Sequence, residues 1–196
     1  DCERWVGRQQ AEALAGAVGD DLSLGFGGDD TLTGGAGQDT ILAGAGDDLI
    51  VLTDIPSQSG ERIDGGAGRD TLQVDAGGSI HGDLLPVLDI AGLEALDLEN
   101  GAANALDLVT LGDVFDLSGP GDQEIADLLG SDAVPNVSIF GDETDVVTLQ
   151  NTAISSFERA DGVTVADSNG TEMDIYQYFG NGALLATLAV DADVEV

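Results

Sequence analysis

The chain has 196 residues, of which 38 are acidic and only five are arginine, with no lysine, so its formal net charge is −33. Such a polyanion repels nucleic acids and anionic membranes, which excludes both as expected partners. It also repels itself, yet 42% of its residues are hydrophobic, so we expect a core that forms once cations neutralise the charge.

Residues 1–15 differ in composition from the rest of the chain, because they hold the single Trp and two of the five Arg. Residues 9–15 favour helix by propensity. Two interpretations of residues 1–15 stay open: a cap, in which Trp5 and Val6 cover the open end of a stack of repeats, or a linker from a preceding domain. Cys2 is the only cysteine and cannot form an internal disulfide.

A nine-residue repeat organises residues 16–51. It runs GAVGDDLSL, GFGGDDTLT, GGAGQDTIL and AGAGDDLIV, with an aspartate at the sixth position of every unit and a glycine two places before it. The eighth position is apolar in all but the first of these units, where Ser23 stands. Residues 52–64 contain Pro56 and predict a loop that leaves the repeats. Residues 65–73, GGAGRDTLQ, supply a fifth unit.

The composition of the unit predicts a tight turn followed by a short strand. Glycine tolerates positive φ, which suits the Gly- and Asp-rich first six positions, and the last three positions point one apolar side chain inward. Two units then close one coil, so that every second aspartate stacks about 4.8 Å from its counterpart. Two carboxylates at that distance repel by roughly 3 to 4 kcal/mol at an effective dielectric constant near 20. A cation between the stacked turns is therefore expected.

Calcium fits this predicted site best, because it takes about six to eight oxygen ligands in flexible geometry, whereas Mg²⁺ prefers a small octahedral site and keeps its waters. We expect roughly two to four Ca²⁺ ions. The aspartates expected to share an ion are Asp21 with Asp39, Asp30 with Asp48, and Asp39 with Asp70. The fifth-position aspartates expected to face solvent are Asp20, Asp29 and Asp47. The candidate ligands are the sixth-position aspartates and the turn glycines: Asp21, Asp30, Asp39, Asp48, Asp70, Gly25, Gly28, Gly34, Gly35, Gly37, Gly44, Gly46, Gly65, Gly66 and Gly68.

The units GGDDTLT, GGAGQDTIL, AGAGDDLIV and GGAGRDTLQ resemble the GGxGxDxUx nonapeptides of RTX proteins. The resemblance directly covers about a third of the chain. It implies a parallel β-roll, folding triggered by calcium outside the cell, and export by a type I secretion system, whose signal lies at the C-terminus of its substrates. A disordered Gly/Asp-rich linker is the alternative, but disorder would not place Leu32, Ile41, Ile50 and Leu72 at the same position of each unit.

Residues 76–196 are predicted to form a β-rich capping and secretion region. Apolar and acidic residues alternate at 93–98 and 105–109, which indicates half-buried strands. Asn169-Gly170 and Asn181-Gly182 indicate hairpin turns. One short helix is expected over residues 121–130. Further strands are expected at 71–75, 137–140, 145–149, 163–166, 173–179 and 184–190.

This region resembles, more loosely, the segment that comes after the repeats in large type I secreted adhesins, through GLEALDLENGAANALDL, NVSIFGDETDVVTL and DGVTVADSNGTEMDIYQYF. Residues 120–135 depart from that pattern. The sequence thus predicts an all-β chain: a cap or linker at 1–15, a parallel β-roll at 16–75, and an extension of β-roll or β-sandwich type with one short helix.

Catalysis by this chain is not expected, because it contains no HExxH, GxSxG or P-loop motif. His81, the only histidine, is expected in a solvated loop, and Asp142 and Asp145 in a solvated turn rather than a calcium site. The predicted function is a calcium-dependent folding and export module at the C-terminus of a type I secreted adhesin or exoprotein on the cell surface. Two alternatives remain: the C-terminal domain of a secreted hydrolase, and a calcium-triggered self-assembly or surface-binding module. The expected partners are calcium, the secretion apparatus and a surface ligand held by upstream domains, with the chain itself monomeric and not inserted in a membrane.

Overall fold

The computed structural model describes residues 2–53, 60–75, 88–99, 105–108, 136–143, 145–149, 155–166, 170–194 and 196. All regular elements within these residues are strands, which confirms the all-β prediction. None of the described residues forms a helix long and apolar enough to cross a membrane. The helix expected over residues 121–130 and the loop expected around His81 lie outside the described residues.

The described strands are β1 (Arg4–Val6), β2 (Ala13–Ala15), β3 (Leu22–Leu24), β4 (Thr31–Thr33), β5 (Thr40–Ala45), β6 (Leu49–Leu52), β7 (Glu61–Ala67), β8 (Thr71–Val74), β9 (Leu88–Ala91), β10 (Ala95–Asp97), β11 (Ala105–Leu108), β12 (Asn136–Phe140), β13 (Val146–Leu149), β14 (Ser155–Ala166), β15 (Glu172–Gly180) and β16 (Ala183–Asp191).

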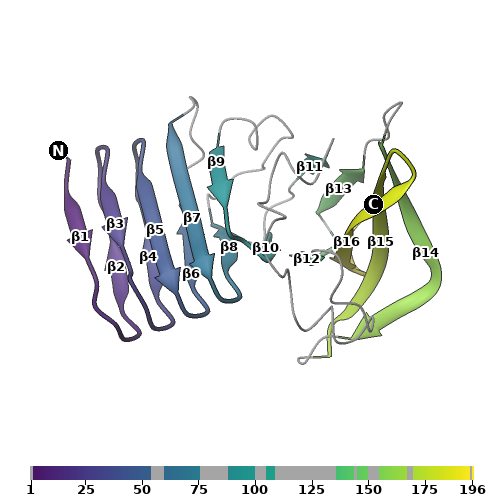
Figure 1. Ribbon diagram of the computed structural model, residues 1–196. Coiled ribbons are helices and arrows are strands. Elements are labelled where there is room, and N and C mark those ends of the chain that lie inside the picture. Colours follow the sequence, from purple (N-terminus) through teal and green to yellow (C-terminus); the bar gives the residue numbers. More distant parts are fainter. Residues whose placement is uncertain are drawn as a thin grey trace.

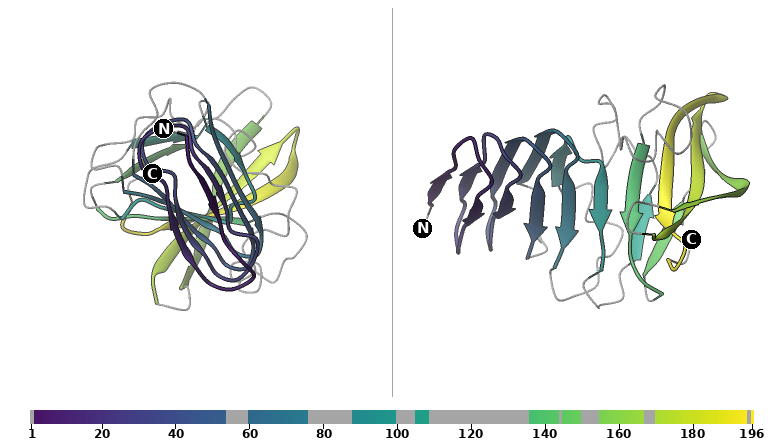
Figure 2. Two further views of the ribbon diagram at one scale, coloured as in Figure 1. Left: turned by 90° about the vertical axis from the view of Figure 1, so that its left-hand side faces the viewer. Right: turned by 90° about the horizontal axis from the view of Figure 1, so that it is seen from below.

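Consecutive strands alternate between two parallel sheets and so build a roll (Figure 1). One sheet has the order β1-β3-β5-β7-β9, and the other contains the even-numbered run β2-β4-β6-β8-β10. Corresponding residues of neighbouring coils are 18 apart in the first part of the roll and 22 apart across the interruption. Seen along the axis, the N-terminal coils lie nearly over one another (Figure 2, left). The predicted parallel β-roll is therefore confirmed.

The eighth position of each unit supplies the core of the roll. Its apolar side chains are at most 2% exposed, because alternate residues of each strand point between the two sheets. They are Leu32, Ile41, Ile50, Ile63 and Leu72. The same cluster extends to Leu96, Ile139 and Leu188, so a single core continues from the repeats into the C-terminal strands.

Residues 1–15 also contribute strands to the roll, since β1 pairs with β3 and β2 pairs with β4. The helix predicted over residues 9–15 is wrong, because part of this segment is strand β2. Glu12 and Leu14 repeat the spacing of Asp30 and Leu32 with glutamate in place of aspartate. Stacking on the next coil thus overrides the helix propensity of a short segment. Trp5 lies opposite Ser23 and remains 38% exposed.

The interruption of the repeats is shorter than the predicted loop at 52–64. Leu52 ends β6 and Glu61 begins β7, and only residues 54–59 between them lie outside the described residues. Ile63 is fully buried in the core. Glu61 and Ile63 have the same spacing as Asp39 and Ile41, so β7 is a further copy of the repeat strand with glutamate at the sixth position.

The C-terminal strands extend the even-numbered sheet and form its far edge. β12 lies between β10 and β16 in parallel, and β15 and β14 then add in antiparallel pairing (Figure 1). The predicted Asn181-Gly182 turn is confirmed, since φ is 52° at Asn181 and 78° at Gly182. β14 is longer than the predicted strand at 163–166 and carries a register shift between Arg159 and Thr164. β11 and β13 pair in a separate two-stranded sheet.

Candidate metal centre

The sixth-position carboxylates form two rows along the edges of the roll, one before the odd-numbered strands and one before the even-numbered strands. In the odd row, the backbone N–H of Glu3 donates to Oδ1 of Asp21 at 2.7 Å. The N–H of Asp21 donates to Oδ1 of Asp39 at 2.8 Å, and the N–H of Asp39 to Oε2 of Glu61 at 3.1 Å. Each carboxylate therefore links its own coil to the coil before it.

The even row is longer. Oδ1 of Asp30 accepts from the N–H of Glu12 at 2.8 Å, and Oδ1 of Asp48 accepts from the N–H of Asp30 at 2.7 Å. Asp70 accepts from Asp48 at 2.9 Å, and Oε2 of Glu94 accepts from the N–H of Asp70 at 2.9 Å. Asp48 thus has an aspartate neighbour on both sides.

The structure stacks Asp21 beside Asp39 and Asp30 beside Asp48, as predicted. The predicted pairing of Asp39 with Asp70 is wrong, because Glu61 occupies the position next to Asp39 and Asp70 belongs to the even row. The sequence prediction missed the glutamates of both rows. Their signal was an acidic residue two places before an inward side chain, as in Glu61 and Ile63.

The second carboxylate oxygen of four of the five row aspartates is buried without a hydrogen-bond partner. This holds for Oδ2 of Asp30, Asp39, Asp48 and Asp70, in side chains that are at most 2% exposed. Asp21 differs, since its Oδ2 accepts from the N–H of Ala17 at 3.1 Å. A buried, unsatisfied charged oxygen costs several kcal/mol or more unless a cation or a donor compensates it. These oxygens are therefore the atoms that a bound cation would satisfy.

A first-position glycine keeps space free beside Oδ2 of Asp30, Asp39 and Asp70, whereas Ala43 takes this position in the unit of Asp48. A Cβ placed on Gly25 would lie 2.5 Å from Oδ2 of Asp30 and closer still to the carbonyl oxygen of Ala43. A Cβ on Gly65 would lie 2.7 Å from Oδ2 of Asp70 and would clash with the carbonyl oxygen of Gly92. A carboxylate oxygen and a backbone carbonyl thus converge beside the first-position glycine. This all-oxygen donor set fits calcium.

The candidate glycines fall into two groups. Gly25, Gly34 and Gly65 lie beside the sixth-position carboxylates, and so does Gly16, which the sequence prediction missed. The others have positive φ, between 98° and 152°, and form the turns themselves: Gly28, Gly35, Gly37, Gly44, Gly46, Gly66 and Gly68. No three acidic, His or Cys side chains converge among the described residues, so backbone oxygens would have to complete any ion's coordination.

Burial changes the pKa of the carboxyl groups in the two rows. It raises the pKa of Asp30, Asp39 and Asp48 above the ordinary aspartate value, against the lowering effect of the hydrogen bond that each accepts. Burial raises the pKa of Asp70 to about 7, and the charges of Asp48 and Glu94 add to the shift. Without a cation, the ionised rows are therefore electrostatically unfavourable.

Asp145 is not in a solvated turn, so that prediction is wrong for this residue. It is fully buried, and its Oδ2 accepts from the N–H of Asp142 at 2.9 Å. Asp145 and Val147 repeat the spacing of Asp39 and Ile41, and Val147 is also fully buried. The sequence therefore contained the signal for a buried aspartate at position 145, directly before a strand.

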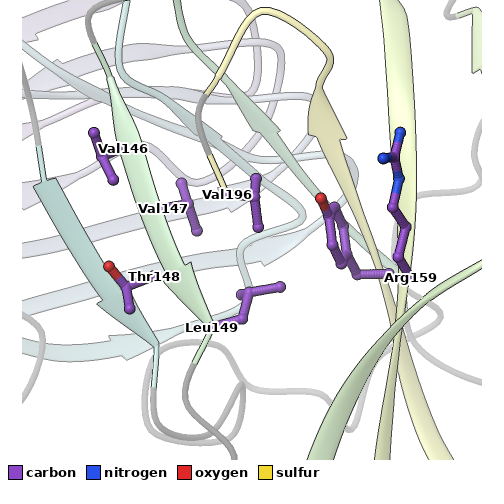
Figure 3. A pocket seen from close by; sticks show the side chains of 7 residues that line it. Val146, Val147, Thr148, Leu149, Arg159 and Val196 are labelled. Atoms are coloured by element: carbon purple, nitrogen blue, oxygen red, sulfur yellow. The ribbon is translucent and has the colours of Figure 1, made fainter.

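Described residues of the C-terminal part line two of the cavities. One, of about 330 Å³, is lined by Val146, Val147, Thr148, Leu149, Arg159, Tyr176 and Val196 (Figure 3). Its Arg159 is paired with Asp174 at 2.5 Å. The other, of about 430 Å³, is lined in part by Glu99. Burial raises the pKa of Glu99, and the charges of nearby acidic residues raise it further. The lining of this second cavity is acidic, through Glu99, Asp142, Glu172, Asp191 and Asp193.

Comparison with known families agrees with this geometry. Residues 24–52 and 58–78 match the family model described as the RTX calcium-binding nonapeptide repeat, in four copies. No curated protein and no solved structure matches the chain. The matched residues contain Asp30, Asp39, Asp48 and Asp70, the side chains with unpartnered buried oxygens. This chain therefore carries RTX calcium-binding nonapeptide repeats, a type of repeat that binds Ca²⁺ within a β-roll.

Proposed function

We propose that this chain is a calcium-dependent folding module, in which ions held between stacked turns convert a self-repelling polyanion into the roll. The observation that carries the proposal is the set of buried, unpartnered oxygens on Asp30, Asp39, Asp48 and Asp70. The proposed ligands are these carboxylates together with the carbonyls that converge beside the first-position glycines. Because the rows exist only when the coils are stacked, ion-binding free energy is folding free energy.

The size of the effect follows from linkage. At roughly 1 mM free calcium, a site with a dissociation constant of about 0.1 mM stabilises the folded state by about 1.4 kcal/mol. Two to four such sites would contribute roughly 3 to 6 kcal/mol, which is comparable with the whole stability of a marginal domain. Low calcium would leave the chain unfolded, and millimolar calcium would fold it.

The test is a calcium titration of protein first stripped with a chelator. We expect far-ultraviolet circular dichroism to change from coil-like to β-rich, and calorimetry to give two to four bound ions. The same β-rich spectrum in excess chelator would contradict the proposal.

The biological setting we propose is export through a type I secretion system, followed by folding outside the cell, at the C-terminus of a large surface adhesin or exoprotein. RTX repeats are typical of secreted proteins, and three segments, at residues 92–108, 136–149 and 161–179, resemble those that come after such repeats in adhesins. Coexpression with a type I apparatus tests this part. The chain is expected in the medium when the apparatus is active, and retention in the cells would contradict export.

A further inference from the structure

The fifth-position side chains form two outer rows, one beside each row of sixth-position carboxylates. Oδ1 of Asp20 accepts from the backbone N–H of Gln38 at 3.1 Å, and Oδ1 of Asp29 accepts from the N–H of Asp47 at 3.1 Å. Oδ1 of Asp47 accepts from the N–H of Arg69 at 2.9 Å. The three aspartates are exposed, as predicted, but each one bonds the next coil.

The sixth-position and fifth-position carboxylates accept hydrogen bonds from opposite directions along the roll. Asp48 accepts from Asp30, one coil earlier, whereas its neighbour Asp47 accepts from Arg69, one coil later. The turn at Asp47 and Asp48 is therefore bonded on both sides. Its two N–H groups donate to Oδ1 of Asp29 in the earlier coil and to Oδ1 of Asp70 in the later coil.

Glycine at the fourth position leaves room for the outer carboxylates. A Cβ on Gly46 would clash with the carbonyl oxygen of Gly28 and would also lie 3.0 Å from Oδ1 of Asp29. A Cβ on Gly68 would clash with the carbonyl oxygen of Gly46 and would also lie 3.1 Å from Oδ1 of Asp47. The neutral Gln38 reaches the same way, since a Cβ on Gly60 would lie within 2.5 to 2.9 Å of its carboxamide atoms. A side chain without charge is thus accommodated in an outer row.

We infer that Asp29 and Asp47 are positioning residues that hold the turn of the next coil so that its buried carboxylate keeps its register for a cation. Asp29 bonds the residue immediately before Asp48, and Asp47 bonds the residue immediately before Asp70. The role requires a hydrogen-bond acceptor rather than a charge. This inference deepens the proposed function and rests on it.

The test compares Asp47→Ala with Asp47→Asn, because asparagine keeps the acceptor and loses the charge. Losing the hydrogen bond is expected to raise the calcium concentration for half-folding about three- to tenfold in Asp47→Ala. Asp47→Asn is expected within about twofold of the unchanged protein. Glu158→Ala, an exposed and distant acidic residue in β14, is the control for losing one negative charge.

Calorimetric stoichiometry separates positioning from ligation. Asp47→Ala is expected to keep the number of bound ions, whereas Asp70→Ala is expected to lower it. Equal shifts in Asp47→Ala and Asp47→Asn would overturn the inference, because charge would then be the cause. An unchanged midpoint in Asp47→Ala, or the loss of an ion, would overturn it as well.

Failure of the proposed function is recognised separately, in the unchanged protein, as folding that ignores calcium. In that case, the positioning role of Asp47 is tested by the midpoint temperatures of thermal unfolding, measured in chelator. Asp47→Ala is expected to melt below Asp47→Asn, and equal midpoints would overturn the inference.

Discussion

At the scale of single residues, the first-position glycines are where backbone geometry and ion chemistry meet. Gly25 has no positive φ that would explain its identity. It is glycine because a Cβ would enter the space shared by Oδ2 of Asp30 and the carbonyl oxygen of Ala43. Ala43 takes this position in the next coil of the even row and is itself buried.

Gly25→Ala is therefore expected to destabilise the folded state by about 1 to 3 kcal/mol through overpacking and to weaken calcium binding. Gly27→Ala is the matched control, since its Cβ would meet only the carbonyl oxygen of Ala45, at 3.3 Å. We expect the control to stay within about 1 kcal/mol of the unchanged protein. Calcium titrations and thermal unfolding of the two variants measure the difference, and equal calcium midpoints would refute the role given to Gly25.

Phe26 is a second residue-scale feature, because a bulky side chain with φ of 73° is strained. Gly35, Gly44 and Gly66 take the same second position in other units, with φ between 102° and 120°. The Phe26 side chain is 54% exposed, so it gains little from burial.

Comparing Phe26→Gly with Phe26→Ala isolates the strain, since both variants lose the ring and only glycine relaxes the backbone. We expect Phe26→Gly to be more stable than Phe26→Ala by about 1 kcal/mol. Chemical denaturation in saturating calcium measures this difference. The opposite order, which glycine and alanine show in ordinary strands, would mean that position 26 carries no strain.

At the scale of the elements, the unequal rows predict unequal sites. Asp48 lies between Asp30 and Asp70, whereas Asp21 has Asp39 on one side and Glu3 on the other and already has a partner for its Oδ2. The even row thus holds most of the unpartnered oxygens.

Asp48→Asn is expected to raise the calcium midpoint about tenfold, and Asp21→Asn less than about threefold, because the amide keeps the Oδ1 acceptor but binds calcium less well. In chelator, Asp48→Asn is expected to be more stable than the unchanged protein, because the substitution removes a buried charge from the metal-free fold. Paired titrations with and without calcium check both halves. A variant that is weaker under both conditions would argue for a purely structural role of Asp48.

How far the sequence predicts these elements depends on which positions carry the signal. The nine-residue spacing of aspartate and the inward apolar residue predicted the coils from Leu22 to Leu52 and the candidate ligands within them. It missed the coils where glutamate replaces aspartate, at Glu12 and Glu61, because the pattern was defined by aspartate and glycine. The length of β14 was missed as well, since the pairing of residues 155–159 with β15 is a tertiary contact that no local pattern reports.

At the scale of the whole molecule, charge and burial act together. With a formal charge of −33, the metal-free fold is opposed both by general repulsion and by the buried rows. The raised pKa values of Asp30, Asp39, Asp48 and Asp70 mean that the folded state binds protons more tightly than the unfolded chain.

The sign of the pH dependence follows from this difference. In chelator, protonation of these buried carboxylates stabilises the folded state. This stabilisation is fully present below the ordinary aspartate pKa of 3.8 and is lost as pH rises toward about 7, the pKa of Asp70. We therefore expect the thermal midpoint of the metal-free protein to fall between pH 5 and pH 7.5, by roughly 5 °C or more. Saturating calcium should flatten or reverse this trend, since the ion replaces the proton. A metal-free midpoint that rises with pH would contradict the account of the rows.

The two ends of the stack of strands carry different chromophores. Trp5, the only tryptophan, lies in the first coil, while both tyrosines of the chain lie in β15, beyond the last parallel strand. Indole emission and phenolic near-ultraviolet absorption consequently report on opposite ends of one stack. Both signals can be recorded after a rapid increase in calcium concentration. If they change with the same time course, all the coils fold together as one cooperative unit. If one signal lags behind the other, the coils at the end that changes first fold first.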